Sequence, residues 1–165
     1  MIIERTVNRL ANDYRGVAQA RQVDLRENLA EKLARARRSL LAKDIYDLGH
    51  LGPRLRGEMP VIRELVYLKV FGDVVVSGKG GRPFFGGREY RNHAPAELLD
   101  TAEVGALVQR AIDWPALLRV VADVFGDGIG DPRDDRERRL AACETRDRYW
   151  YGVQLEEVKR RHGRR

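Results

Sequence analysis

The sequence predicts a mainly α-helical protein. Apolar residues recur every three to four positions along most of the chain, which is the spacing that places them on one side of a helix. No stretch alternates apolar and polar residues for long enough to indicate a sheet. Aspartates stand directly before several of the periodic stretches, where a carboxylate can cap the first turn. With 165 residues, one compact domain is the expected organisation.

Two amphipathic helices are expected at the start of the chain. Residues 3–20 have apolar side chains at helical spacing, although Gly16 weakens the middle of this helix by about 1 kcal/mol. The second helix is expected from Leu25 to Leu41, with a leucine and alanine face and a basic flank. Asp24 is its expected N-cap, and Glu27 stands three residues later as a capping-box partner.

A short helix, a buried helix and a loop are expected next. The short helix starts at Asp44, its N-cap, and ends at the Gly-Pro pair of residues 52–53. Pro60 opens a helix that is apolar on nearly all sides, so we expect it to lie in the core. The glycine-rich run VVVSGKGGRPFFGGREY, residues 74–90, predicts a loop. Its SGKGGRP segment lacks the glycine spacing and the Ser/Thr of a phosphate-binding P-loop, which favours a simple connection.

Four further helices complete the prediction. Residues 100–112 begin with an Asp-x-x-Glu capping box. Residues 113–125 begin with Asp-Trp-Pro, and proline is favoured in a first helical turn. After the break GDGIGDP, helices are expected over residues 134–144 and 150–161, followed by a basic tail.

The charge balance favours an anionic partner. The formal net charge is +6 and the isoelectric point is near 9.8, and nucleic acid is the commonest partner of such a chain. The alternative is a chain whose arginines are merely solvated. Cys143 is the sole cysteine, no apolar run is long enough to span a membrane, and the first residues lack the apolar region of a signal peptide. We therefore expect a cytoplasmic protein.

Metal-dependent chemistry has no clear motif of its own in this sequence. Nucleotidyl transfer usually needs two acids that alternate on a strand after a Gly-Ser turn and hold a divalent metal, and no such pattern is present. His50, His93 and His162 share no ligand spacing with one another or with Cys143, so a zinc site is not expected.

One segment carries a sharper pattern. AEKLARARRSLLAKDIYDL, residues 30–48, consists of Ala-Glu-Lys-Leu, a basic stretch, a Lys-Asp pair and Tyr-Asp-Leu. This order resembles the nucleotidyltransferase toxins of the AbiEii/AbiGii family, which belong to type IV toxin–antitoxin systems. The segments LVYLKVFGDVV, GRPFFGG and DRERRLAACETRD continue the resemblance, which covers roughly residues 23–150.

The resemblance implies a fold and an organisation. Family members carry the metal-binding acids in an N-terminal α/β part, followed by a helical part. This chain matches the helical, C-terminal part, so the α/β catalytic core is expected to be largely absent. The expected divisions are residues 1–22, a helix outside the match; residues 23–125, the AbiEii-like helical domain; and residues 126–165, the C-terminal helices and basic tail.

The resemblance also implies site residues. The lysine of the Ala-Glu-Lys motif and the aspartate of the Asp-Leu motif, here Lys32 and Asp47, are the expected catalytic residues. An ammonium can neutralise triphosphate oxygens as charge builds in the transition state, and a nearby carboxylate can orient it or act as a base. Glu31, Asp44 and Arg35 are possible supporting residues. Glu31 can alternatively form an ion pair with Arg35 one turn later, and Lys32 with Asp47 can be an ordinary ion pair between helices worth at most about 1 kcal/mol.

Three functions follow from these observations. The first is a toxin that transfers nucleotides from an NTP to an RNA such as tRNA with Mg²⁺, restrained by a cognate antitoxin, as the resemblance implies. The second is a truncated, catalytically inactive member that binds RNA or a partner protein through a basic helical surface. The third is a helical protein-interaction module without a nucleotide. The expected nucleic-acid contacts, which matter most for the second function, are Arg37, Arg38, Lys159, Arg160 and Arg161.

Overall fold

The computed structural model describes residues 24–79, 95–126 and 129–162. Within these ranges the chain is helical without any β-strand, which confirms the mainly α prediction. No helix in these ranges has the length and apolar character that crossing a membrane requires. The helix expected over residues 3–20 lies outside the described residues.

The first two described helices, α2 and α3, form a pair. Helix α2 spans Leu25–Ala36 and α3 spans Ala42–Leu51. The Asp24 carboxylate accepts a hydrogen bond from the backbone of Arg26, which confirms it as the N-cap. The expected continuation of α2 to Leu41 is wrong. Tertiary pairing overrides the helical pattern there. The backbone N–H of Ala42 donates to the backbone oxygen of Leu99, and the N–H of Leu99 donates to the backbone oxygen of Leu40.

A continuous series of helical turns follows α3. Helix α3 ends at the Gly-Pro pair as expected, since Gly52 is its C-cap. A 3₁₀ helix, η1, spans Gly52–Glu58, and Pro53 lies in its first turn, where its missing N–H is not needed. Helix α4 spans Met59–Phe71 and has Pro60 in its first turn, as expected. The expected loop after it is wrong at its start, since Gly72–Val76 form a π-helical turn, η2. Residues 80–90 of that loop lie outside the described residues.

The remaining helices match the expected segments closely. After a short 3₁₀ turn, η4 (Pro95–Glu97), they are α5 (Thr101–Val108), α6 (Trp114–Phe125), α7 (Asp135–Ala142), η5 (Thr145–Asp147) and α8 (Arg148–His162). The side chains of Asp113 and Asp134 cap α6 and α7 as expected. Asp100, in contrast, has a left-handed backbone and makes no side-chain cap, so the capping box expected for α5 is wrong.

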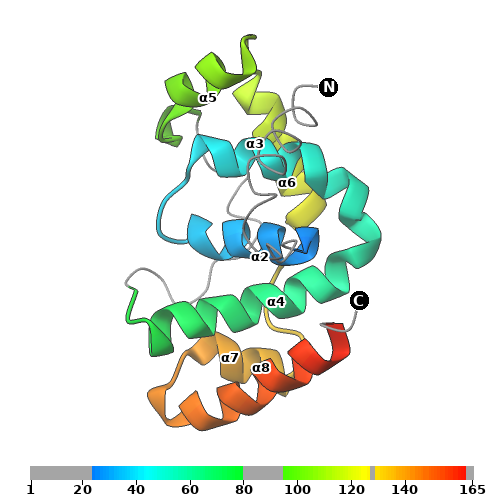
Figure 1. Ribbon diagram of the computed structural model, residues 1–165, viewed down its shortest axis with the longest axis vertical. Helices are drawn as coiled ribbons and strands as arrows, with labels where there is room; N and C mark the ends of the chain where they lie inside the picture. Colours follow the sequence, from blue (N-terminus) through cyan, green and yellow to red (C-terminus); the bar gives the residue numbers. More distant parts are fainter. Residues whose placement is uncertain (1–23, 80–94, 127–128, 163–165) are drawn as a thin grey trace, which may run out of the picture.

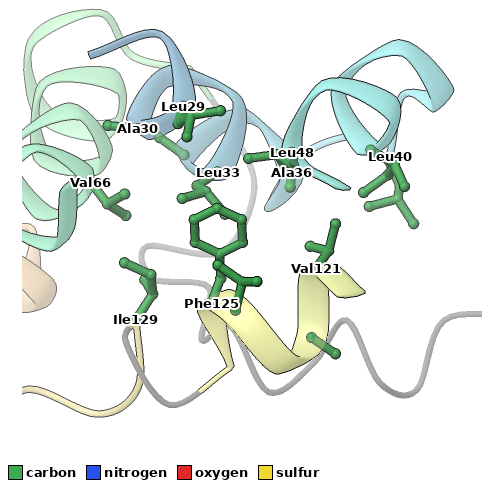
Figure 2. Packing of buried hydrophobic residues seen from close by; sticks show 14 of the residues in the cluster. Leu29, Ala30, Leu33, Ala36, Leu40, Leu48, Val66, Val121, Phe125 and Ile129 are labelled. Atoms are coloured by element: carbon green, nitrogen blue, oxygen red, sulfur yellow. The ribbon is translucent and has the colours of Figure 1, made fainter. Parts of the chain in front are cut away.

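Helix α4 lies at the centre of the arrangement. Figure 1 shows α2, α3, α5 and α6 on one side of it and α7 and α8 on the other. The larger apolar core lies on the first side, where Phe125 and Val121 of α6 face α2 and α3 (Figure 2). Ile45 and Leu48, on the inner side of α3, are fully buried in it. This core holds α2 and α3 together and so fixes the relative position of the polar side chains between them.

Candidate functional site

The structure brings Lys32 and Asp47 together. The Nζ atom of Lys32, in the middle of α2, lies 2.9 Å from Oδ2 of Asp47, on α3. The same ammonium lies 3.4 Å from Oδ1 of Asp44, one turn earlier on α3. The side chain of Lys32 is only 12% exposed, whereas that of Asp47 is 42% exposed. Lys32 is therefore held between two carboxylates, one at the surface and one inside.

Asp44 is the inner carboxylate of this cluster. Its side chain is 3% exposed, and its Oδ2 lies 3.0 Å from Nε of Arg35, although the two groups are not aligned as a hydrogen bond. The expected N-cap role of Asp44 is wrong, because Leu41 occupies the N-cap position of α3 and Asp44 lies within the first turn. The helix instead turns the carboxylate towards α2. We name Lys32, Arg35, Asp44 and Asp47 the lysine–aspartate cluster.

The electrostatics of the lysine–aspartate cluster follow from its burial. Two cations and two carboxylates balance one another, so the cluster has no formal net charge. Removing a carboxylate such as Asp44 from water costs several kcal/mol, and this cost is met only while its cationic partners stay in place. The same contacts hold the Lys32 ammonium at one position, which is the preorganisation that electrostatic catalysis needs.

Glu31 lies outside the cluster. Its carboxylate is 3.3 Å from Nζ of Lys69 on α4, and Glu27 binds the same ammonium at 3.1 Å. Arg35 forms its ion pair with Asp44, and not with Glu31. The structure therefore gives Glu31 a role in joining α2 to α4.

The two expected nucleic-acid contacts that follow α2, Arg37 and Arg38, are engaged with a carboxylate. The Arg37 side chain is fully buried and lies 3.4 Å from Oδ2 of Asp73, so it is not part of the molecular surface. Arg38, which is 27% exposed, lies 3.1 Å from the same oxygen, and Lys79 lies 3.1 Å from the other oxygen. The Asp73 carboxylate thus links the residues that follow α2 to those that follow η2.

The cations at the end of α8 differ among themselves. Lys159 and Arg160 are exposed, and Lys159 is 2.7 Å from Glu156 on the same helix. Arg161 instead reaches back to Glu64 on α4, at 2.7 Å. Burial raises the pKa of Glu64, but hydrogen bonds from Arg161 and Arg136 outweigh burial and hold this pKa below its usual range. Arg161 therefore has a structural contact, and Lys159 and Arg160 remain available at the surface.

A shallow depression lies on α7 and η5, on the other side of α4 from the lysine–aspartate cluster (Figure 1). Its arginines are paired with acids: Arg139 donates to Asp147 at 2.7 Å through Nε, and this contact lowers the pKa of Asp147 although burial acts against it. The guanidinium of Arg139 also lies over the Trp150 ring, 4.3 Å from its centroid. These contacts fasten α7 to α8. The residues lining the depression are Arg138, Arg139, Ala142, Glu144, Arg146 and Asp147.

The described residues do not fit a divalent metal. They contain no group of three or more His, Cys, Asp or Glu side chains that is arranged to hold an ion. Asp44 and Asp47 come closest, but the ammonium of Lys32 already lies between them. A cation in that position repels a second one, so the chemistry of the cluster is that of a placed ammonium and not that of a metal centre.

The sequence contained a signal for Asp44 that its capping pattern obscured. Asp44 and Asp47 are three residues apart on one helix, a spacing that places both side chains towards the same neighbour. The crossing of α2 and α3, which brings Lys32 to both, depends on the apolar core and is not visible in the sequence.

Comparisons with known proteins place this geometry in context. No protein-family model matches the chain, and no curated protein matches it significantly. Among solved structures, the chain is similar to MenT4, a nucleotidyltransferase toxin from Mycobacterium tuberculosis H37Rv, with a TM-score of 0.71 and 32% sequence identity over 82% of this chain. The chain spans 45% of the length of MenT4. In both sequence and fold, this chain is thus similar to part of a nucleotidyltransferase toxin.

Proposed function

We propose that this chain is the helical part of a nucleotidyltransferase toxin of the AbiEii type and that it serves the transfer of a nucleotide from an NTP to an RNA such as tRNA. The observation that carries the proposal is the Lys32 ammonium fixed between Asp44 and Asp47. It occurs in a chain that is 32% identical to a nucleotidyltransferase toxin. Both lysine and aspartate lie in the segment with the sharpest resemblance to the AbiEii pattern.

The cluster supplies charge and position. During transfer, negative charge builds on the triphosphate oxygens, and a fixed ammonium such as that of Lys32 stabilises it without reorganisation. Asp47 is the most exposed member of the cluster, at 42%, and it orients Lys32 or accepts the proton of the acceptor hydroxyl. Asp44 and Arg35 act as positioning residues, because the buried carboxylate of Asp44 holds Lys32 and Arg35 in turn holds Asp44.

Two further components belong to the proposal. Mg²⁺ assists transfer by binding the triphosphate, and in this proposal the acids that hold it lie outside the described residues. A cognate antitoxin restrains the activity, as the toxin resemblance implies, and the proposed location of the protein is the cytoplasm.

Transfer of labelled nucleotide tests the proposal directly. The protein expressed from its complete reading frame is incubated with Mg²⁺, total tRNA and each of the four labelled NTPs in turn. We expect Lys32→Ala and Asp47→Ala each to lower incorporation by a factor of about 10² or more, the usual cost of losing one preorganised charged group. A smaller loss is expected for Asp47→Asn, which keeps the shape of the side chain.

Lys69→Ala is the matched control. Lys69 also lies between two carboxylates, Glu27 and Glu31, but away from the cluster, so its loss should leave incorporation within about threefold of the wild type. Incorporation that is unchanged in the Lys32 and Asp47 variants would refute the assigned roles. If the folded wild-type protein transfers no label from any NTP, the enzyme proposal fails and a binding module for RNA or a partner protein becomes the better description.

A further inference from the structure

We propose that the exposed face of α3 next to Asp47 is a platform on which the single-stranded end of the acceptor RNA stacks. In this proposal the Tyr46 and His50 rings take the bases, and Lys43 and Arg110 contact the phosphates. The inference rests on the proposed function, since it places the acceptor strand beside the lysine–aspartate cluster.

The helical geometry of α3 places these residues on one side. Successive residues of an α-helix are rotated by about 100°, so Lys43, Tyr46, Asp47 and His50 occupy one arc. The opposite arc is buried in the core and contains Ile45 and Leu48, both with no exposed surface. Asp47 lies at the edge of the exposed arc that is nearest to α2, because it contacts Lys32 there. A strand on the arc therefore ends beside the cluster.

The aromatic pair is held in place before any ligand binds. The Tyr46 and His50 rings lie 4.2 Å apart between centroids, with an interplanar angle of 31°. His50 Nδ1 is 2.8 Å from the backbone oxygen of Tyr46, and Arg110 Nη2 donates to the Tyr46 hydroxyl at 3.4 Å. Both residues are intermediate in exposure, and Tyr46 also packs against the edge of the apolar core. Rings that are already oriented lose little conformational freedom when a base stacks on them.

Among the described residues, the cations of this face lack acidic partners, whereas the cations of the lysine–aspartate cluster are paired with carboxylates. Lys43 is exposed and has no ion pair within the described part of the chain, and the same holds for Arg54, one turn beyond His50. Arg110 donates a hydrogen bond to a neutral group, the Tyr46 hydroxyl. Unpaired cations on either side of exposed rings complement a nucleic-acid strand, whose phosphates are anionic and whose bases are flat and apolar.

The pair of neighbouring rings on the face favours a strand over a free nucleotide. Lys43 and His50 are seven residues apart along α3, which corresponds to about 10 Å, and the cations extend beyond the rings at both ends. Two rings can receive two successive bases, which a strand supplies and a single nucleotide does not. A duplex is also disfavoured, because its bases are stacked internally and cannot reach the rings.

Fluorescence anisotropy with a labelled single-stranded RNA of about twelve nucleotides tests the platform without requiring activity. We expect Tyr46→Ala and His50→Ala each to weaken binding about tenfold, within the range for loss of one stacked base. We expect Lys43→Ala to reduce the slope of log affinity against log salt by about 0.7, the value for one phosphate contact of a single strand. Tyr149→Ala, which removes an aromatic ring on α8 that is 87% exposed, should leave binding unchanged, and circular dichroism checks that every variant is folded.

The outcomes separate this proposal from the proposed function. Binding that is as tight in folded Tyr46→Ala and His50→Ala as in the wild type overturns the platform, even if label transfer succeeds. Displacement of the strand by an equal concentration of NTP, or equal binding of a duplex, also overturns it. Binding that depends on Tyr46 and His50 but persists in Lys32→Ala supports the platform, and it does so even if no label is transferred.

Discussion

The two sides of α4 are stabilised in different ways. On the first side, α2, α3, α5 and α6 share a large apolar core in which Phe125, Ile45 and Leu48 are fully buried. On the second side, α7 and α8 pack against α4 through a small group of buried side chains, which are Tyr67, Leu68, Phe71, Leu140 and Val158. We call these the first and the second side below.

Arginine ion pairs supplement the small core of the second side. Arg63 of α4 binds Glu137 of α7 through two parallel hydrogen bonds of 2.7 and 2.6 Å. Arg136 of α7 binds Glu64 of α4 at 2.5 Å. Bidentate, charge-assisted contacts fix the orientation of a helix more strictly than apolar contacts of the same size. The stability of the first side therefore depends mainly on apolar burial, whereas the stability of the second side depends more on the charge state of its acids.

The two tryptophans of the chain allow the two sides to be followed separately. Trp114, at the start of α6, packs against the first core, and Trp150, on α8, packs against the second. In a Trp150→Phe variant, fluorescence reports the first side, and in a Trp114→Phe variant it reports the second. All predictions below use these two variants as backgrounds.

The largest effect is expected for Phe125→Ala. Phe125, the last residue of α6, has no exposed surface, and its ring points towards α2 (Figure 2). Deleting a buried phenyl ring costs about 3–5 kcal/mol. Urea unfolding followed through Trp114 should show this loss. Leu107→Ala is the control, since Leu107 is 71% exposed and its loss should change the free energy of unfolding by less than about 0.5 kcal/mol. Equal losses in the two variants would contradict the assigned core.

An intermediate effect is expected for Gly52→Ala. A Cβ atom at this position would lie 2.7 Å from Cε2 of Phe125 and 3.3 Å from Cγ1 of Val124, both of which belong to the packed core. Overpacking of this kind costs about 1–3 kcal/mol, and chemical denaturation measures it. Gly57→Ala, in the same 3₁₀ helix, meets nothing within 4 Å and should be neutral or slightly stabilising. If Gly52→Ala is also neutral, η1 does not pack as closely on α6 as the structure indicates.

The smallest effect is expected from mild acidification, and it should appear first on the second side. Burial raises the pKa of Glu137, but hydrogen bonds from Arg63 outweigh burial, so the pKa of Glu137 is lowered, as is that of Glu64. An acid whose pKa is lowered by folding contributes stability above its unfolded pKa, and this stability is lost as the pH falls through the folded value. Since unfolded glutamate titrates near 4.3, the two acids should lose on the order of 1 kcal/mol in total by pH 4.

The measurement is urea unfolding at pH 7 and pH 4 in both tryptophan backgrounds. The urea midpoint reported by Trp150 should fall more than the midpoint reported by Trp114. Coincident midpoints would show that α4 joins the two sides into one cooperative unit and would contradict the comparison. Asp24 is the described acid of the first side whose pKa is lowered, through its hydrogen bond with Arg26, so a small fall is expected there too. A larger fall on the first side would reverse the comparison.

Much of the helical pattern could be predicted from local features of the sequence. Asp24, Asp113 and Asp134 marked three helix starts correctly, because a capping aspartate acts on the backbone of the next few residues. Pro60 and the apolar run after it identified α4 as a core helix. The errors occurred where distant residues intervene. Leu99, far along the chain, pairs with residues 40–42, where the helix was expected to continue, and no local pattern near Leu41 records this contact.

The candidate site was predictable in part. The resemblance of residues 30–48 selected Lys32 and Asp47, and their contact at 2.9 Å agrees with a shared site, although their catalytic roles stay a prediction. Local reasoning assigned Asp44 to a helix cap and Glu31 to Arg35, because it considers only neighbours on the same segment. The structure instead joins Asp44 to α2 and Glu31 to α4. The exposed arc of Tyr46 and His50 has helical spacing, but its exposure depends on where α2 and α6 pack.

By itself, the sequence determined that the protein is mainly helical, that it is basic, and that its sharpest motif contains Lys32 and Asp47. These properties depend on composition, on periodicity and on contacts within a few residues. Only the tertiary structure decided that Asp44 is buried behind Lys32 and that Arg37 is buried on Asp73. It also decided that Lys43 and Arg110 have no acidic partner among the residues that the structure describes. The physical reason is that burial and ion pairing between helices depend on how the helices cross, and crossing is set by the shape of the whole apolar core.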